Sequence, residues 1–266
     1  MKILAIICVR NEAQYLEVLV PYLAAEGVEI ALIDNDSSDG TLDLFSSQKY
    51  PNIIEVTRLP FYGVFDLSGQ LEAKDTVAAR SAANWLIHQD ADEILHSPSG
   101  WGGLRQSIEV ADSAGFNVLN FNELVMLPAD PEVDDIMQNN SNCYFFEPRP
   151  LRLMRAWKRE ANLTSRASGG HILSGQDIHV SPQLMIMKHF IVRSQVHALQ
   201  KYLRRSFSAT DLRKGWHSKR LSFTENNLKI PEYGENIHKL ASPKSTLTEL
   251  PRGVRAHYWD WPQPSD

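Results

Sequence analysis

Trp85-Leu86-Ile87-His88-Gln89-Asp90-Ala91-Asp92-Glu93-Ile94-Leu95 is an apolar run interrupted by two carboxylates that one alanine separates. The run predicts a buried β-strand, and Asp90 and Asp92 point the same way if the extended geometry continues. Two hard oxygen ligands with open coordination positions suit Mg²⁺ or Mn²⁺ held against a diphosphate better than a closed structural metal site. The same acids could instead cap a helix or line a solvated turn, so this stretch by itself leaves both interpretations open.

The residues before this stretch alternate between strand and helix patterns. Residues 3–9 form a continuous apolar run, which predicts a strand buried on both faces. A helical pattern of leucines and valines follows and ends at Gly27, and residues 28–33 and 53–56 predict two further strands. A second helical pattern covers residues 71–84. The alternation predicts an α/β protein with a Rossmann-like, mostly parallel central sheet flanked by helices, whose ligands gather at the carboxyl ends of the strands.

A second acidic cluster, Asp34-Asn35-Asp36, ends the strand predicted over residues 28–33. The carboxyl ends of parallel strands share one edge of a sheet, so we expect this cluster on the same edge as Asp90-Ala91-Asp92. The polar residues up to Thr41 would also suit a turn and a helix N-cap. Two independent carboxylate clusters at the ligand-binding edge favour a binding site over two unrelated turns.

Composition and charge restrict the classes of function. The chain has 266 residues, 43% of them hydrophobic, and a net charge of −5, which argues against nucleic acid as the main partner. Cys8 and Cys143 alone support neither a disulfide framework nor a cysteine-based zinc site. No run approaches the ~18 apolar residues of a membrane span, and the first apolar run is followed by charge. We expect a soluble cytoplasmic protein that can still contact a membrane surface to meet a lipid-linked acceptor.

The patterns weaken beyond residue 95. Residues 128–142 are acidic and turn-rich, and residues 149–158 carry apolar side chains among arginines, which predicts an edge strand. Residues 184–192 predict another strand, and residues 195–206 predict a basic amphipathic helix. The tail over residues 208–266 has no clear period.

Three motifs together resemble a known family. Val9-Arg10-Asn11-Glu12, the segment Asp34 to Thr41, and Asp90-Ala91-Asp92-Glu93 have the order and spacing of a family 2-type glycosyltransferase with the GT-A fold. The chain is most similar to small cytoplasmic members with an Arg-Asn-Glu start, an Asp-Ala-Asp-Glu motif and a late His-Tyr/Phe-x-x-Arg-Ser segment, which reads His189 to Ser194 here. The resemblance covers residues 1–95 and, less closely, 165–205.

The resemblance implies a nucleotide-sugar donor, most simply a UDP-sugar. The turn Val9 to Glu12 would flank the base, and Asp34 or Asp36 would bind the uracil or the ribose, since carboxylates accept hydrogen bonds from N–H and O–H groups. The nucleotide-binding residues that it implies are Val9, Arg10, Asn11, Glu12, Asp34, Asn35, Asp36, Asp90, Ala91 and Arg193.

The resemblance also implies a metal site for Mn²⁺ or Mg²⁺. Asp92 would bind the ion directly, Asp90 would lie nearer the ribose, and His189 would supply a third ligand. A lone histidine in an apolar run is otherwise more often a core residue. Arg193 could contact phosphate. Glu93 would either orient the two aspartates or cap the following turn.

An inverting transfer needs a base for the acceptor hydroxyl. Members of the family draw it from a loop about 80 to 100 residues beyond the metal motif, where Asp177 lies in this chain. The Glu-Asp dipeptide that many members carry there is absent, so Glu123, Glu147, His171 and His179 remain competitors and Asp177 can be a simple turn residue.

The sequence thus predicts a metal-dependent, inverting glycosyltransferase that moves a sugar from a nucleotide sugar to a hydroxyl of a glycan, a lipid-linked molecule or a small molecule. The resemblance divides it into a GT-A domain over residues 1–206, with a nucleotide-binding half (1–95) and a smaller acceptor-side half (96–206), and an extension (207–266) that is packed on it or partly mobile. A binding module without catalysis is one rival. A sugar-phosphate nucleotidyltransferase is another, but it would need a Gly-rich triphosphate loop after the first strand, and none is present there.

Overall fold

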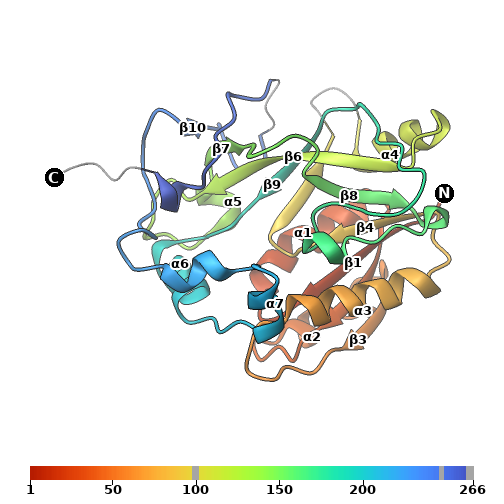
Figure 1. Ribbon diagram of the computed structural model, residues 1–266, viewed down its shortest axis with the longest axis horizontal. Helices are drawn as coiled ribbons and strands as arrows, with labels where there is room; N and C mark the ends of the chain where they lie inside the picture. Colours follow the sequence, from red (N-terminus) through yellow and green to blue (C-terminus); the bar gives the residue numbers. More distant parts are fainter. Residues whose placement is uncertain (98–101, 246–248, 262–266) are drawn as a thin grey trace.

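Four parallel strands form the half of the sheet that the sequence predicts best (Figure 1). The computed structural model describes residues 1–97, 102–245 and 249–261. The four strands lie in the order β3-β2-β1-β4, which is a doubly wound arrangement. Their bounds are Ile3–Val9 (β1), Glu29–Asp34 (β2), Ile53–Arg58 (β3) and Trp85–Gln89 (β4).

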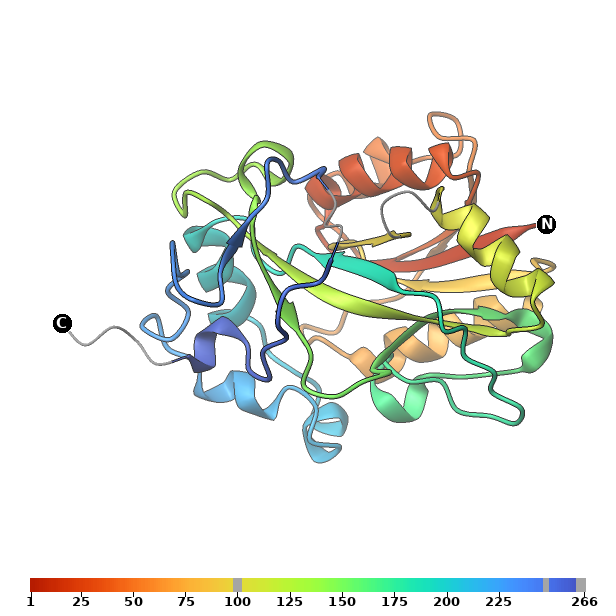
Figure 2. The same ribbon diagram turned by 90° about the horizontal axis from the view of Figure 1, so that it is seen from above.

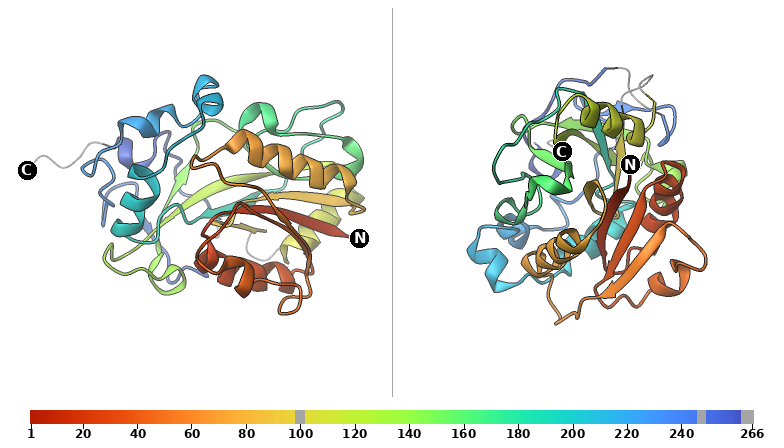
Figure 3. Two further views of the ribbon diagram at one scale, coloured as in Figure 1. Left: turned by 90° about the horizontal axis from the view of Figure 1, so that it is seen from below. Right: turned by 90° about the vertical axis from the view of Figure 1, so that its right-hand side faces the viewer.

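Helices cover both faces of this half, as Figures 2 and 3 show. The alternate residues Ile3 and Ile7 pack under α1 (Ala13–Ala25) and α4 (Leu104–Ser113), whereas Leu4 and Ile6 face Val77 of α3 (Leu67–Arg80). Both strand faces are therefore buried, which is why the strands read as continuous apolar runs. A short helix, α2 (Thr41–Leu44), follows β2. The predicted α/β class with helices on both faces is confirmed.

The other half of the sheet is mixed. Its long central strand is β6 (Val118–Leu127), which pairs antiparallel with β7 (Asn142–Phe146) and β8 (Leu153–Lys158) and parallel with β9 (Met185–His189). Strand β8 lies between β4 and β6, so the expectation of an edge strand over residues 149–158 is wrong. The short strand β10 (His238–Lys239) adds to β7.

Residues 85–95, which the sequence predicts as one strand, form two. Strand β4 stops at Gln89 and β5 (Glu93–His96) starts after the aspartates, pairing with β9 instead of with β4. The buried Gln89 amide donates to the carbonyls of Asp90 and Glu93, both at 2.8 Å, and so satisfies the backbone of the bend. The bend takes Asp90 and Asp92 out of the sheet ladder. The two side chains are therefore oriented by the bend and not, as expected from the sequence, by a continuing strand.

The C-terminal third lies at one end of the sheet, drawn in blue in Figure 1. Helix α6 (Gln195–Leu203) and later side chains such as Leu228 and Trp259 pack with β6 and β7 in one buried cluster. The remaining short helices are α5 (Ile136–Asn139), α7 (Ala209–Arg213) and 3-10 turns at Arg159–Ala161, Arg166–Ser168, Ser218–Ser222 and Tyr258–Asp260. Within the described ranges, the helices are too short or too polar to span a bilayer.

Candidate active site

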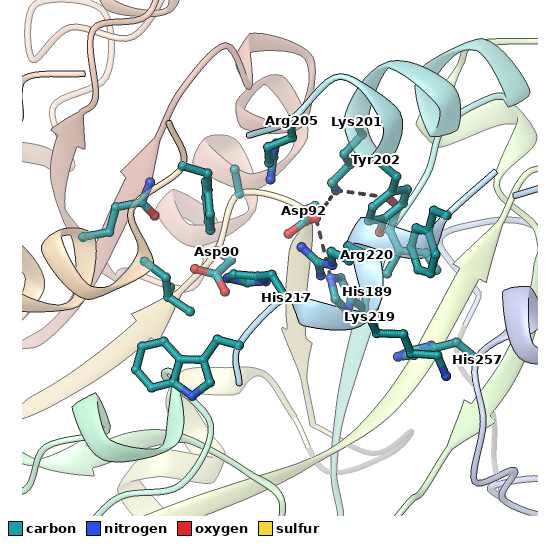
Figure 4. Close-up of a pocket in the computed structure, with 18 of the residues that line it drawn as sticks. Asp90, Asp92, His189, Lys201, Tyr202, Arg205, His217, Lys219, Arg220 and His257 are labelled. Atoms are coloured by element: carbon teal, nitrogen blue, oxygen red, sulfur yellow. Dashed lines mark hydrogen bonds and ion pairs between the residues drawn. The ribbon is translucent and has the colours of Figure 1, made fainter. Parts of the chain in front are cut away.

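A cleft of about 1150 Å³ opens where β1 and β4 end. One side is lined by the turn after β1, the loop containing Phe61 and the Asp90–Glu93 bend. Helix α6 and the C-terminal segment, including Trp216 and His257, line the other side. The acidic bend therefore faces side chains that are more than one hundred residues away in sequence (Figure 4).

Asp92, His189 and Glu123 form a chain of three polar side chains. Strand β9 lies between β5 and β6, which brings His189 next to both acids. His189 Nε2 is 3.5 Å from Asp92 Oδ2, and His189 Nδ1 is 2.5 Å from Oε1 of the buried Glu123. A carboxylate on one imidazole nitrogen orients the ring and leaves the other nitrogen free to bind a metal.

Lys201 reaches Asp92 from α6. Its Nζ is 2.8 Å from Asp92 Oδ2 and also donates to the Ile191 carbonyl at 3.0 Å. The helix begins at a Ser194 cap and buries Ala198 and Tyr202, which directs Lys201 toward the cleft. Burial would raise the pKa of Asp92, but the charges of Lys201 and His189 outweigh it and hold that pKa below its usual range.

Asp90 is held by two cations, Lys74 and Arg155, that were not predicted from the sequence. Lys74 Nζ of α3 is 2.9 Å from Oδ1, and the Arg155 guanidinium of β8 is 3.3 Å from Oδ2. Lys74 also donates to the Gln89 carbonyl at 2.9 Å. Burial acts to raise the pKa of Asp90, but Lys74 and Arg155 hold it well below its usual range, so the carboxylate is charged.

Arg155 also connects the bend to the loop after β8. It forms an ion pair with the fully buried Glu93 and donates to the Gly170 carbonyl at 2.8 Å. Glu93 therefore supports the bend from behind and is not a solvated cap. Gly170 has φ 89°, and a Cβ there would lie 2.9 Å from Cε1 of His88, so both the conformation and the space require glycine.

Lys74 and Arg155 are two site residues that were not predicted from the sequence. Lys74 is 6% exposed although it lies on a helix, and Arg155 is 3% exposed because β8 is an inner strand. The sequence signal for Arg155 was its place among the apolar side chains of residues 153–157. A charged residue in such a run usually faces solvent, so the signal does not indicate burial.

The predicted nucleoside residues divide into two groups. Arg10, Asn11 and Glu12 line the cleft, whereas Val9 and Asp34-Asn35-Asp36 do not. The cluster Asp34-Asn35-Asp36 instead supports residues that line the cleft. Arg10 Nη1 donates to the Asn35 carbonyl at 2.7 Å, its guanidinium lies 3.5 Å from the Phe61 ring centre, and the Asp36 carboxylate accepts the Phe61 N–H at 2.7 Å.

Ala91 and Arg193, which the resemblance assigns to the nucleotide, line the cleft, and Arg193 already has a partner. Its Nε is 3.0 Å from Oδ1 of Asp134, which belongs to the acidic segment before α5. The guanidinium also lies over the Tyr15 ring, 5.3 Å from its centre. Arg193 is thus available to a ligand only if this ion pair opens or is shared.

The structure does not bring Asp177 to the cleft. Asp177 lies in an exposed turn with φ 54°, and its carbonyl accepts a 2.6 Å hydrogen bond from Asn117 Nδ2. Of the four competing residues, His171 lines the cleft and Glu123 is engaged with His189, whereas Glu147 and His179 lie outside the cleft lining. Burial holds the pKa of His171 well below its usual value, so its imidazole is neutral at physiological pH.

The residues present fit a divalent ion with open coordination positions. Within residues 1–97, 102–245 and 249–261, no three His, Cys, Asp or Glu side chains are grouped closely enough to hold a metal. Asp92 and His189 offer one oxygen and one nitrogen, and Glu123 supports the imidazole. Such a pair matches an ion whose other ligands are phosphate oxygens and water.

Comparisons with known proteins yield only distant likenesses. Neither a protein-family model nor a curated protein sequence matches the chain. Among solved structures, S. aureus TarS has a TM-score of 0.43 and 15% identity over 85% of this chain, which spans 45% of the TarS chain. Glucosyl-3-phosphoglycerate synthase from Mycobacterium tuberculosis, in complex with Mn²⁺ and UDP, has a TM-score of 0.30 and 14% identity over 47% of this chain and 44% of its own. A UDP-glucose pyrophosphorylase with UDP-glucose has a TM-score of 0.31 and 11% identity over 66% of this chain and 74% of its own. At these scores the likenesses do not assign the chain to a family.

Proposed function

We propose that this protein is a GT-A-type glycosyltransferase that moves a sugar from a UDP-linked donor to an acceptor hydroxyl, with Mn²⁺ or Mg²⁺ bound and with inversion at the anomeric carbon. The observation that carries the proposal is the chain Asp92–His189–Glu123 in a large cleft at the carboxyl ends of parallel strands. The Gly-rich loop of a nucleotidyltransferase is absent after β1, which favours a transferase of sugars.

The nucleoside end of the donor is assigned to the turn from Arg10 to Glu12 and to Phe61. The base would lie against this turn, and Asp34-Asn35-Asp36 would act by holding Arg10 and Phe61 in place. The hydrogen bonds from Arg10 to the Asn35 carbonyl and from the Phe61 N–H to the Asp36 carboxylate support this assignment.

The diphosphate end is assigned to Asp92 and His189 with the surrounding cations. A bound divalent ion would supply charge stabilisation for the leaving nucleoside diphosphate. Lys201 and Arg205 line the cleft beside Asp92 and would donate to the phosphate oxygens, while Lys74 and Arg155 keep Asp90 ionised and aimed at the donor.

His171 is assigned as the group that accepts the acceptor's proton. It lies in the chain segment from which the resemblance draws the base, and it lines the cleft. The proton would pass from the attacking hydroxyl to a ring nitrogen as the new C–O bond forms and the bond to the diphosphate breaks. Asp177 is the alternative, and it would need its exposed turn to move.

Calorimetry of UDP binding tests the donor site. We expect Mn²⁺ to strengthen UDP binding in the wild type and to have no effect in Asp92→Asn. Asp43→Asn, an exposed acid on α2, is the matched control and should keep the metal effect. Absence of UDP binding with or without metal would contradict the proposal.

An assay of UDP release from UDP-sugars in the presence of metal tests the base. Without an acceptor it measures hydrolysis, and the increase on adding a candidate acceptor measures transfer. We expect His171→Gln to bind the donor normally and to lower the transfer rate by about 100-fold or more. Asp177→Asn should transfer at the wild-type rate. The reverse pattern would move the role to Asp177, and donor binding without any turnover in the wild type would identify a binding module.

A further inference from the structure

The cleft is basic although the chain is acidic. The residues that line it include nine Lys or Arg and five Asp or Glu, an excess of four positive charges in a chain with a net charge of −5. The diphosphate of a nucleotide sugar carries two negative charges, which one divalent ion cancels. The proposed donor and its metal therefore leave this excess uncompensated.

The cations of the cleft differ in whether they already have an ion-pair partner. Arg155, Lys201, Arg193 and Lys219 each contact a carboxylate. The other five make no ion pair with the described residues, and two of these five, Arg220 and Arg255, come from the C-terminal segment after residue 206. The Arg220 guanidinium is 5.2 Å from the Tyr202 ring centre, and the side chain is partly buried.

An aromatic platform lies beside these arginines. The His257 ring stacks on Phe146 with 3.7 Å between centroids and tilts against Trp259 at 4.5 Å. Tyr144 Oη is 2.8 Å from His257 Nδ1 and fixes the ring. The parts of Phe146, His257 and Trp259 that line the cleft offer apolar surface against which a sugar ring can pack.

His257 of the platform and Asp90 lie on different sides of Asp92. In Figure 4, Asp90 lies to one side of Asp92, while Lys219 and His257 lie on the other. Arg220 lies close to Asp92 and His189, between the two sides. The C-terminal segment thus lines the part of the cleft that lies across Asp92 from Asp90.

We propose that this side is the acceptor subsite and that the acceptor is a sugar bearing a phosphate or a carboxylate, which Arg220 and Arg255 bind while the sugar ring packs on the Phe146–His257–Trp259 platform. The inference rests on the proposed glycosyltransferase function. Guanidinium groups match the planar, two-oxygen geometry of both anions, which is why arginine is suited to this task.

Calorimetry on the full chain saturated with UDP and Mn²⁺ tests the subsite, because the donor site is then filled. The probes are glucose, galactose and mannose, their 6-phosphates, and glucuronate and galacturonate. We expect at least one anionic sugar to bind about tenfold or more tightly than its neutral parent, which corresponds to one charge-assisted hydrogen bond. The 6-phosphates and the uronates separate a phosphate acceptor from a carboxylate acceptor.

Arg220→Gln and Arg255→Gln should each remove this preference, whereas Arg213→Gln, an exposed arginine outside the cleft lining, should keep it. The UDP affinity of Arg255→Gln should equal that of the wild type, which shows that the variant is folded. Equal binding of neutral and anionic sugars to the wild type would overturn the acceptor inference and leave the proposed function standing. A preference for the anionic sugar that persists in both Arg220→Gln and Arg255→Gln would do the same. Absence of UDP binding to the wild type, with and without Mn²⁺, would overturn the proposed function itself.

Discussion

Glu123 is buried, and one of its carboxylate oxygens lies 2.5 Å from Nδ1 of His189. The neutral amide of Glu123→Gln would keep the size of the side chain but weaken the hold on the imidazole. Because groups behind a metal ligand typically contribute a factor of 10 to 100 to metal affinity, we expect Mn²⁺-dependent UDP binding to weaken about tenfold or more.

Titration of Mn²⁺ into the UDP-bound protein measures this effect. Glu147→Gln, an exposed acid outside the cleft lining, is the control. UDP affinity without metal should be the same in all three proteins. Wild-type metal affinity in Glu123→Gln would remove His189 from the proposed metal site.

His96 at the end of β5 makes stability depend on pH. Its Nε2 is buried without a hydrogen-bond partner in the described residues, and burial lowers its pKa to about 3. An unfolded histidine titrates near 6.5, so between these values the unfolded chain binds more protons and stability falls as the pH drops. The contribution is complete above about pH 6.5 and is lost progressively below it.

Replacing His96 by Leu removes this contribution. Between about pH 7.5 and pH 5.0, the variant should lose about 2 kcal/mol less unfolding free energy than the wild type. Urea unfolding at the two pH values measures the difference, and His96→Phe repeats it with a ring that keeps the packing against Tyr22. A pH dependence that is identical to the wild type in both variants would show that His96 is not buried in its neutral form.

The acidic segment before α5 is tied to the start of α6 by the pair Asp134–Arg193. This contact connects two segments that are distant in sequence and uses an arginine that the resemblance assigns to phosphate. In Asp134→Asn the guanidinium is released, and a charge-assisted hydrogen bond to the donor becomes accessible. We expect UDP to bind about three- to tenfold more tightly, with a steeper dependence on salt.

Glu132→Gln removes a charge from the same segment without breaking an ion pair of the described residues and is the matched control. Calorimetry at two salt concentrations measures both quantities. Unchanged or weaker UDP binding in Asp134→Asn would show that Arg193 serves the segment and not the donor.

The C-terminal segment shares its core with the sheet. Leu228 is fully buried in a cluster with Val125 of β6, Tyr144 of β7 and Tyr202 of α6. Leu228→Ala should therefore destabilise the whole protein by about 2–5 kcal/mol, the usual cost of a leucine-sized cavity. Urea unfolding followed by far-UV circular dichroism and by tryptophan fluorescence should give two coincident curves that shift together.

Leu221→Ala serves as the reference, since Leu221 is 63% exposed and its loss should change the unfolding free energy by less than about 0.5 kcal/mol. A separate early transition in Leu228→Ala would instead mean that the extension unfolds independently of the sheet.

The sequence alone determined the first half of the fold. Its inner strands β1, β2 and β4 are buried on both faces and its helices have one apolar face, so each of these elements is readable from its own residues. The order of motifs placed Asp90-Ala91-Asp92 at the ligand-binding end of the sheet. The same local patterns misread residues 85–95 as one strand and residues 149–158 as an edge.

Only the tertiary structure decided which side chains meet at the cleft. Lys74 reaches Asp90 from the preceding helix α3, and Arg155 reaches it from β8, 65 residues further along the chain. Glu123 reaches His189 because β9 lies beside β6, and the C-terminal segment supplies Arg220. A charged residue carries no sequence signal of burial when its partner lies tens of residues away, because the ion pair that makes its burial tolerable exists only after the chain has folded.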